Sequence, residues 1–337
     1  MKKISLFLIS FLFLISCKSE KTTESHRYNG EALGTTYNIR YFSDRDLDFE
    51  KSLDSIIEEI NSSMSTYLVK SDISRINRGD TTVTVDKNFE KVFNASNKIF
   101  KESDGFFDPT VGVLVNAYGF GPAKPLKSIS ADSLDSLRNL VGFNKVTLTD
   151  KLTIKKEHPA IYLDFNAIAK GYAIDVIAEY LESKDVENYL IELGGELRAK
   201  GENLGNNANW VVGIDDPEQV DGERRLQARV KLLNSAMATS GNYRKYRVDS
   251  ITGQKYVHTI NPKTGKAEKS NVLSASVLAE NCMLADGYAT AFMALGIERS
   301  TQLLKELDDV EVYILYSTPA GDMDIFSTPG FKENILD

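Results

Sequence analysis

The chain has few cysteines, few histidines and almost no long apolar sequence. The shortage of cysteine and the shortage of apolar sequence each exclude a class of protein. Its 337 residues include only two cysteines, Cys17 and Cys282, so a disulfide framework cannot hold the fold together. After residue 15, no apolar run is long enough to span a bilayer. The net charge of -8, with both signs interspersed, argues against a nucleic-acid partner, which calls for a clustered basic face.

The first 27 residues are not expected to belong to the globular domain. Residues 1–3 are basic and residues 4–15 form a short apolar run, as in an export signal. Residues 14–17, LISC, resemble the lipobox of bacterial lipoproteins, which implies cleavage after residue 16 and a lipid on Cys17. Residues 17–27 are polar and read as a flexible tether. We therefore expect a protein exported and lipid-anchored to a bacterial membrane, on the periplasmic side; an ordinary secretory signal is the alternative.

One stretch, residues 161–180, combines a strand pattern with a helix pattern. Residues 161–165 are mostly β-branched or aromatic, which predicts a short strand. From residue 168 to 180 the apolar residues recur at roughly helical spacing. The turn between strand and helix would leave helix amides free for a phosphate group.

Two charged residues flank this junction, Asp164 and Lys170. A carboxylate and an ammonium beside a helix start suit a phosphate ligand and its counter-ion. The alternative is a plain connection in which Asp164 caps the helix and Lys170 is solvated.

Two aromatic segments follow the helices predicted over residues 47–64 and 88–103. Tyr67 could offer its ring to a planar ligand. More commonly, such a tyrosine packs with its ring half-buried and its hydroxyl in contact with water. Residues 106–108, Phe-Phe-Asp, form a loop of the kind that often lines ligands. An Asp before proline is also an ordinary turn starter.

Of the three histidines, only His258 is predicted to lie at a strand end beside a cluster of loops. Histidine is well matched to proton transfer near neutral pH, although a lone one is more often structural.

Asp286 and Thr290 lie four residues apart in the helix predicted over residues 281–295, so their oxygens project from one face. Such oxygens suit Mg²⁺ and not zinc. The alternative is an Asp favoured by the helix dipole and a Thr bonded to its own helix backbone.

Eight short motifs occur along the chain, and in this order they resemble the motif set of the ApbE family. They are ALGTTY (32–37), MSTY with SDISRIN (64–77), DGFFDPTVG with GFG (104–121), DFNAIAKGYAID (164–175), IELGGE (191–196), ATSGNYR (238–244), HTINPKTG (258–265) and LADGYAT (284–290). Each motif is weak alone, but eight in series are specific and cover nearly the whole mature chain.

Members of that family are flavin transferases, commonly exported lipoproteins. The resemblance implies that FAD is the substrate, with Mg²⁺ on its pyrophosphate, and that FMN passes to a Thr or Ser hydroxyl of an acceptor protein as AMP leaves. Implied acceptors are redox proteins such as subunits of membrane NADH:quinone reductases or Rnf-type complexes. The implied fold is α+β, with mixed sheets and packed helices in a T-fold-like architecture over residues 28–337.

The resemblance also implies roles for individual residues. The oxygens of Asp286 and Thr290 and the carbonyl of Ala167 would hold Mg²⁺, and His258 would deprotonate the acceptor hydroxyl. Contacts to flavin or pyrophosphate would come from Leu33, Tyr67, Phe106, Phe107, Asp108, Asp164, Lys170 and Ile260. Among these, Lys170 and the helix amides would cradle the phosphates, whereas Tyr67 and the two phenylalanines would stack on the isoalloxazine ring.

This chain departs from the family pattern at two positions. Many relatives have Met where this chain has Leu33, a swap that preserves an apolar contact. Some relatives carry a second carboxylate where this chain has Ala289, which implies a weaker Mg²⁺ site or one completed by the FAD phosphates. Two alternative functions remain open: a Mg²⁺-dependent FAD pyrophosphatase, in which water replaces the acceptor, and a non-catalytic flavin-binding lipoprotein.

Overall fold

The computed structural model describes residues 23–126, 128–217, 219, 225–241, 246–248, 255–257, 259–267 and 270–336. Two residues with predicted roles, Cys17 and His258, lie outside these ranges. Helices and strands are mixed along the described chain, and the strands form antiparallel sheets. The predicted α+β class is confirmed.

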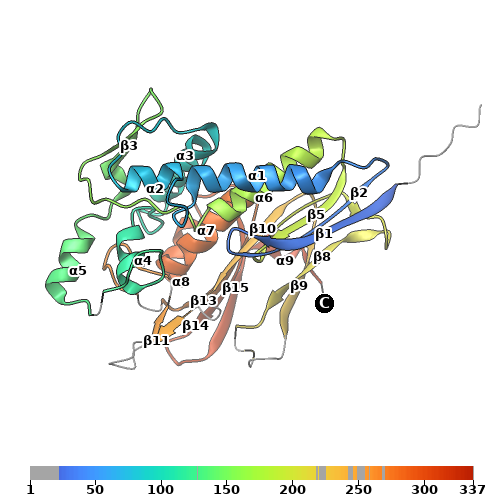
Figure 1. The fold of residues 1–337 in the computed structure, drawn as a ribbon. Coiled ribbons are helices and arrows are strands. Elements are labelled where there is room, and N and C mark those ends of the chain that lie inside the picture. The colour runs from blue at the N-terminus through green and yellow to red at the C-terminus, as the bar shows by residue number, and fades with distance from the viewer. Residues whose placement is uncertain are drawn as a thin grey trace, which may run out of the picture.

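An eight-stranded sheet forms the middle layer, and each strand in it runs antiparallel to its neighbours (Figure 1). In spatial order the strands are β1 (Glu24–Ala32), β2 (Thr35–Ser43), β5 (Asn188–Leu193), β6 (Glu196–Lys200), β10 (Ala236–Gly241), β13 (Val272–Ala279), β14 (Glu311–Ser317) and β15 (Met323–Ser327). The chain thus leaves this sheet after β2 and returns to it at β5, and β6 pairs with β10 in its centre.

Four helices cover one face of this sheet: α1 (Phe49–Met64), α3 (Lys87–Glu102), α6 (Ala169–Ser183) and α7 (Cys282–Leu295). On α1 the buried residues Phe49, Leu53, Ile60 and Met64 form a single stripe, as expected for an amphipathic helix on a core. In contrast, α7 buries ten of its fourteen residues. Its nearly continuous apolar sequence places it inside the main core between the sheet and the outer helices.

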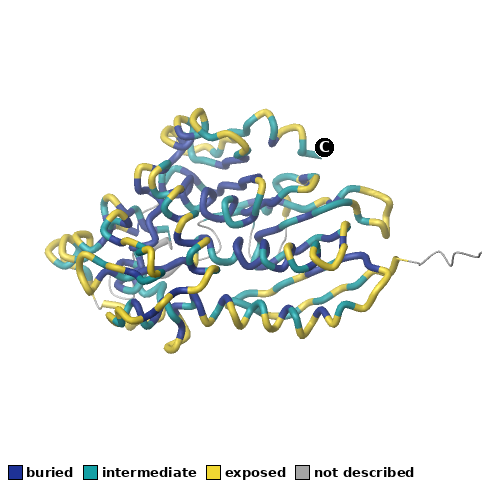
Figure 2. The backbone as a smooth tube through the Cα atoms, turned by 90° about the horizontal axis from the view of Figure 1, so that it is seen from above, coloured by how far each residue is buried: buried dark blue, intermediate teal, exposed yellow. Residues whose placement is uncertain are grey.

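The other face of the sheet packs on a smaller one, whose order is β16 (Ile335–Leu336), β9 (Leu226–Leu232), β8 (Ala208–Asp215) and β7 (Glu202–Asn203). Trp210, Leu315 and Phe331 lie in the core between the two layers. Figure 2 shows buried residues through the middle of the molecule and exposed residues along its outer edges. The fold therefore has three layers: helices, a large sheet and a small sheet.

Short elements complete the described chain. They are α2 (Asp72–Asn77), α4 (Gly112–Tyr118), α5 (Ala131–Arg138), α8 (Ile297–Leu303), α9 (Pro329–Lys332), the 3-10 turn η1 (Phe143–Lys145), and the hairpins β3 (Val146–Leu148) with β4 (Ile154–Lys156) and β11 (Tyr246–Val248) with β12 (Lys255–Val257). Within the described ranges, no helix is both long and apolar enough to cross a membrane.

The first two strands form a hairpin and correct one of the sequence predictions. Leu33 and Gly34 both have positive φ (50° and 75°) and reverse the chain between β1 and β2. Residues 24–27, predicted to be tether, belong to β1 and pair with β2. Their alternating exposure has the period of a strand, which composition alone does not reveal.

Candidate functional site

Residues 161–165 enter the site as an extended segment and not as the predicted strand. Only Tyr162 forms a bridge, with Val111. The segment is held instead by Asn77, whose amide donates to the Leu163 carbonyl and accepts from the Leu163 N–H, both at 2.8 Å. The side-chain amide of Asn77 thus makes the hydrogen bonds to Leu163 that an adjacent strand would otherwise make.

The turn that follows is formed by Asp164, whose Oδ1 accepts the Asn166 N–H at 2.8 Å. Burial raises the pKa of this carboxyl, against the Asn166 hydrogen bonds that lower it. Tyr67 lies beside it: burial and the charge of Asp164 both raise the pKa of the Tyr67 hydroxyl. Tyr67 is 60% exposed, and its predicted contact with a planar ligand stays a prediction.

The helix amides at the start of α6 are largely occupied within the protein. The N–H groups of Ile168 and Ala169 donate to the Phe165 carbonyl, and that of Gly171 donates to Asp286 Oδ2 at 3.0 Å. The expectation that these amides cradle phosphates is therefore wrong for these three. In a regular helix the Gly171 N–H would donate to Ala167. No described residue donates a hydrogen bond to the Ala167 carbonyl, which leaves an oxygen available as a metal ligand.

Asp286 is buried, with 2% of its surface exposed. Its Oδ2 accepts the Gly171 N–H and lies 3.5 Å from the Nζ of Lys170. Burial raises the pKa of Asp286 to about 7, opposed by Lys170 and assisted by the carboxylate of Glu196. Both contacts fall on Oδ2, so Oδ1 is the atom that could coordinate a cation.

Lys170 is held by carboxylates on two sides. Its Nζ lies 3.2 Å from Glu196 Oε1 and 3.5 Å from Asp286 Oδ2. Burial disfavours its charge, but Asp286 and Glu196 outweigh burial and raise the pKa of Lys170 above its ordinary value. Lys170 is therefore paired with two protein carboxylates, and its predicted contact with phosphate stays a prediction.

Thr290 follows Asp286 by about one helical turn, and its Oγ1 lies 3.4 Å from the hydroxyl of Ser240 on β10. Ala289, where some relatives are expected to carry a carboxylate, is fully buried in the main core. No cluster of three or more His, Cys, Asp or Glu side chains suited to a metal occurs among the described residues. A cation here would be held by one carboxylate, a hydroxyl and a carbonyl, a hard-oxygen set that suits Mg²⁺ and needs further oxygens from water or substrate.

Helices α6 and α7 each place an aspartate at the other's first turn. Asp286 of α7 accepts the Gly171 N–H of α6. Asp175 of α6 accepts the N–H groups of Cys282 and Met283 of α7 at 2.9 and 2.8 Å. These carboxylates satisfy helix amides and oppose the positive end of each helix dipole. The two helices are thereby fixed in one register.

The predicted aromatic clamp from Phe106 and Phe107 is not formed. Phe107 is 3% exposed and belongs to the main core. Phe106 is 6% exposed, and the cationic groups of Lys263 and Arg299 lie 5.6 and 4.8 Å from its ring centroid. Both rings are therefore occupied by protein contacts, and of the three predicted stacking residues only Tyr67 is open.

Asp108 is also committed within the protein. Its Oδ1 accepts hydrogen bonds from the N–H and hydroxyl of Thr110, and its Oδ2 accepts the Phe143 N–H at 3.2 Å. These bonds tie the loop after α3 to the turn that precedes β3. The predicted ligand contact by Asp108 is replaced by a role in shaping the loop.

Burial raises the pKa of Asp108 from 3.8 to about 6, against its hydrogen bonds. Because the folded state then binds the proton more tightly than the unfolded state, this group favours folding below pH 4 and loses that contribution as pH rises to 6. The loss is about 3 kcal/mol over two pH units. We expect the free energy of unfolding of Asp108→Asn, relative to the parent, to rise by roughly this amount from pH 4 to 6.5 in urea titrations. A difference between the two proteins that does not change with pH would contradict this assignment.

The remaining predicted residues are placed as follows. Ile260 is 6% exposed and packs in a small core with Leu114 and Tyr118. Leu33 lies in the β1–β2 turn, next to Gly34. This turn lies near the ends of β5 and β6, because the Gly194 N–H donates to the Thr36 carbonyl. His258 lies outside the described residues.

Residues 33–314 match the model of the ApbE family. The chain belongs to the ApbE family. It is 34% identical to the FAD:protein FMN transferase of Haemophilus influenzae over 95% of each chain, and 36% identical to that of Vibrio cholerae over 96% of each. The solved structure of the flavin transferase ApbE from Vibrio cholerae has a TM-score of 0.81 and 33% identity, and it covers 93% of this chain and 100% of that one.

In this ApbE-family chain, the sequence motifs also contain buried or hydrogen-bonded residues to which the sequence assigned no role. Glu196 ends the IELGGE motif and received no role, yet it is buried beside Lys170. Ser240 and Asn77 also lie within motifs and were left unassigned. The sequence offered one indication of these three residues, namely that each lies inside a matched motif. It could not reveal their partners, which lie far away in the sequence.

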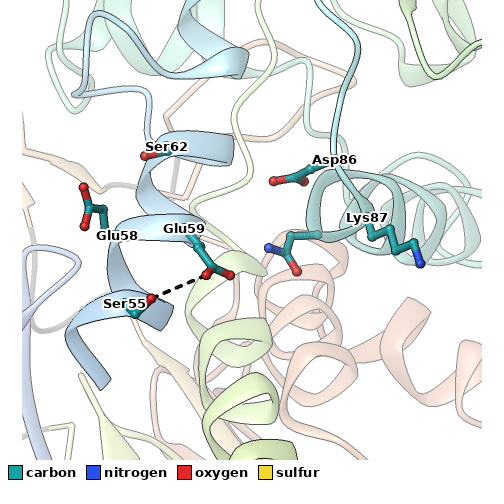
Figure 3. A pocket seen from close by; sticks show the side chains of 7 residues that line it. Ser55, Glu58, Glu59, Ser62, Asp86 and Lys87 are labelled. Atoms are coloured by element: carbon teal, nitrogen blue, oxygen red, sulfur yellow. Dashed lines mark hydrogen bonds between the residues drawn. The ribbon is translucent and has the colours of Figure 1, made fainter. Parts of the chain in front are cut away.

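A surface hollow of about 610 Å³ lies between α1 and the start of α3 (Figure 3). Its lining consists of Ser55, Glu58, Glu59, Ser62, Asp86, Lys87 and Asn88. None of these is predicted to bind FAD or metal. Asp86 accepts the Phe89 N–H at 2.7 Å and so caps α3, which accounts for a carboxylate at this position without a ligand.

Proposed function

We propose that this chain is a FAD:protein FMN transferase that requires Mg²⁺ and transfers FMN from FAD to a Thr or Ser hydroxyl of an acceptor protein. Its curated relatives carry the name of this activity. The observation that carries the proposal is the contact between Asp286 and the Gly171 N–H, because it joins a buried carboxylate to a helix start whose Ala167 carbonyl has no helical partner.

Three groups would hold the metal: the Asp286 carboxylate, the Thr290 hydroxyl and the Ala167 carbonyl. When bound, Mg²⁺ would neutralise negative charge on the phosphate oxygens. Asp286 supplies the only protein charge among these ligands, so oxygens from the pyrophosphate would complete the coordination. Because the substrate would complete the metal site, Mg²⁺ would bind tightly only when FAD is present.

The residues around the turn at Asp164 would orient the flavin. Tyr67 presents an exposed ring beside Asp164, which supports stacking on the isoalloxazine system. The two buried phenylalanines would support the loop from behind.

His258 would act as the general base. It would take the proton from the acceptor hydroxyl, whose oxygen forms a bond to the FMN phosphorus as the bond to the AMP phosphate oxygen breaks. Without an acceptor, water in the same place would release FMN and AMP, which is the activity of the alternative pyrophosphatase. We also propose that Cys17 carries the lipid that anchors the enzyme, so that its acceptors are redox proteins at the same membrane surface.

The experiment that tests the function uses the full chain in detergent, FAD, Mg²⁺ and a threonine-containing acceptor domain from a membrane redox complex. Mass spectrometry of the acceptor is expected to show an added FMN mass that requires both Mg²⁺ and the acceptor threonine. A Thr→Val acceptor is the matched control and should gain no mass. Free FMN and AMP without an adduct would favour the pyrophosphatase, and intact bound FAD without turnover would favour a flavin carrier.

A further inference from the structure

Glu196 is a buried carboxylate with one oxygen engaged and one oxygen without a partner. It begins β6 and is 5% exposed. Its Oε1 lies 3.2 Å from Lys170 Nζ. Its Oε2 is buried and forms no hydrogen bond with any described residue. A buried carboxylate oxygen without a partner is costly, so its retention calls for an explanation.

Lys170 connects this carboxylate to the proposed metal site. Its ammonium lies between Glu196 Oε1 and Asp286 Oδ2, at 3.2 and 3.5 Å. The three side chains together carry two negative charges and one positive charge. The positive charge of Lys170 thus lies in contact with Asp286, and it competes with any divalent cation for that carboxylate.

We infer that Glu196 is a positioning residue that acts through Lys170: it shares the ammonium and so leaves Asp286 available to a divalent cation. This inference rests on the proposed function, in which Asp286 is a metal ligand. Without the charge on Glu196, Lys170 would pair with Asp286 alone. The cluster would then be neutral, and a cation would have to displace the ammonium to bind.

A purely structural ion pair would behave differently. If Glu196 only stabilised the fold through Lys170, neutralising it would lower stability without changing the metal affinity of the folded protein. If Glu196 instead touched the metal, its loss would weaken binding whether or not Lys170 were present. Metal affinity in single and double variants therefore separates the three roles.

The test measures Mn²⁺ binding to the full chain in detergent, without FAD, from the electron paramagnetic resonance signal of free Mn²⁺. Glu196→Gln is expected to weaken binding about tenfold, in the range seen when partners of metal ligands are removed. In the Lys170→Met background, the same substitution is expected to change the affinity less than twofold. Glu187→Gln is the matched control, because Glu187 also pairs with a lysine, Lys200, but is exposed; its affinity should equal that of the parent.

The possible results lead to distinct conclusions. Unchanged affinity in folded Glu196→Gln, or an equal loss with and without Lys170, would overturn the inference. If Glu196→Gln does not fold, Glu196→Asp retains the charge but withdraws it from Lys170, and an affinity equal to that of the parent would likewise overturn it. Asp286→Ala that binds Mn²⁺ as tightly as the parent would instead refute the metal site of the proposed function.

Discussion

Replacing Asp286 by alanine is expected to lower the kcat/KM of FMN transfer about a thousandfold or more. Asp286 is the only charged group among the three proposed metal ligands, and loss of metal stabilisation worth about 4 kcal/mol corresponds to this factor. The fold should survive, because the pair between Lys170 and Glu196 remains. The loss is measured as the initial rate at which FMN appears on the acceptor.

Two further variants make this result specific. Asp286→Asn retains an oxygen for the Gly171 N–H but removes the charge, and we expect it to be nearly as inactive as the alanine variant. Asp54→Asn changes an exposed carboxylate on α1 and should leave the rate unchanged. If Asp286→Asn kept more than a tenth of the parent activity, the carboxylate would not be a metal ligand.

The second large effect is expected at Gly171, where α6 packs closely against α7. A Cβ atom at this position would lie 2.2 Å from the Cys282 carbonyl oxygen and 2.9 Å from Asp286 Cβ. Backbone cannot move aside as a flexible side chain can, so Gly171→Ala would have to push the helices apart. We expect a loss of about 3 kcal/mol or more in the free energy of unfolding, measured by urea titration.

Gly287→Ala on α7 is the matched comparison. Its Cβ would meet the terminal methyl of Ile99 at 2.4 Å, and the next atom is 3.4 Å away. Because the terminal atom of a side chain can shift, and because alanine favours helix, this substitution should cost much less. Equal stability losses at the two glycines would show that helix separation at Gly171 is not the dominant cost.

The sequence predicted the helices well, because their apolar patterns persist over many residues. The helix predicted over residues 281–295 is α7 with a difference of one residue, and the class and family follow from the ordered motifs. The strand predicted over residues 161–165 failed for a tertiary reason. The backbone hydrogen bonds of Leu163 go to Asn77, 86 residues away, and no local pattern reveals such a partner.

The sequence did not reveal the protein partners of individual side chains where each had a choice of partners. Lys170 was assigned to phosphate because it follows a helix start, but it pairs with Glu196 and Asp286. Phe106 was assigned to the flavin, but Lys263 and Arg299 lie against its ring. A sequence gives the type of a side chain, whereas its neighbours depend on how distant segments pack.

The exchange of aspartates between α6 and α7 has a consequence for the order in which the protein matures. The bonds that define the site join residues 107 to 115 positions apart, and closing loops of this length is slow compared with forming local helices. A nascent chain in which α7 has not yet been made contains neither Asp286 nor the N–H groups that Asp175 binds. Such a chain could not assemble a working centre, so activity would begin only when the C-terminal third has arrived.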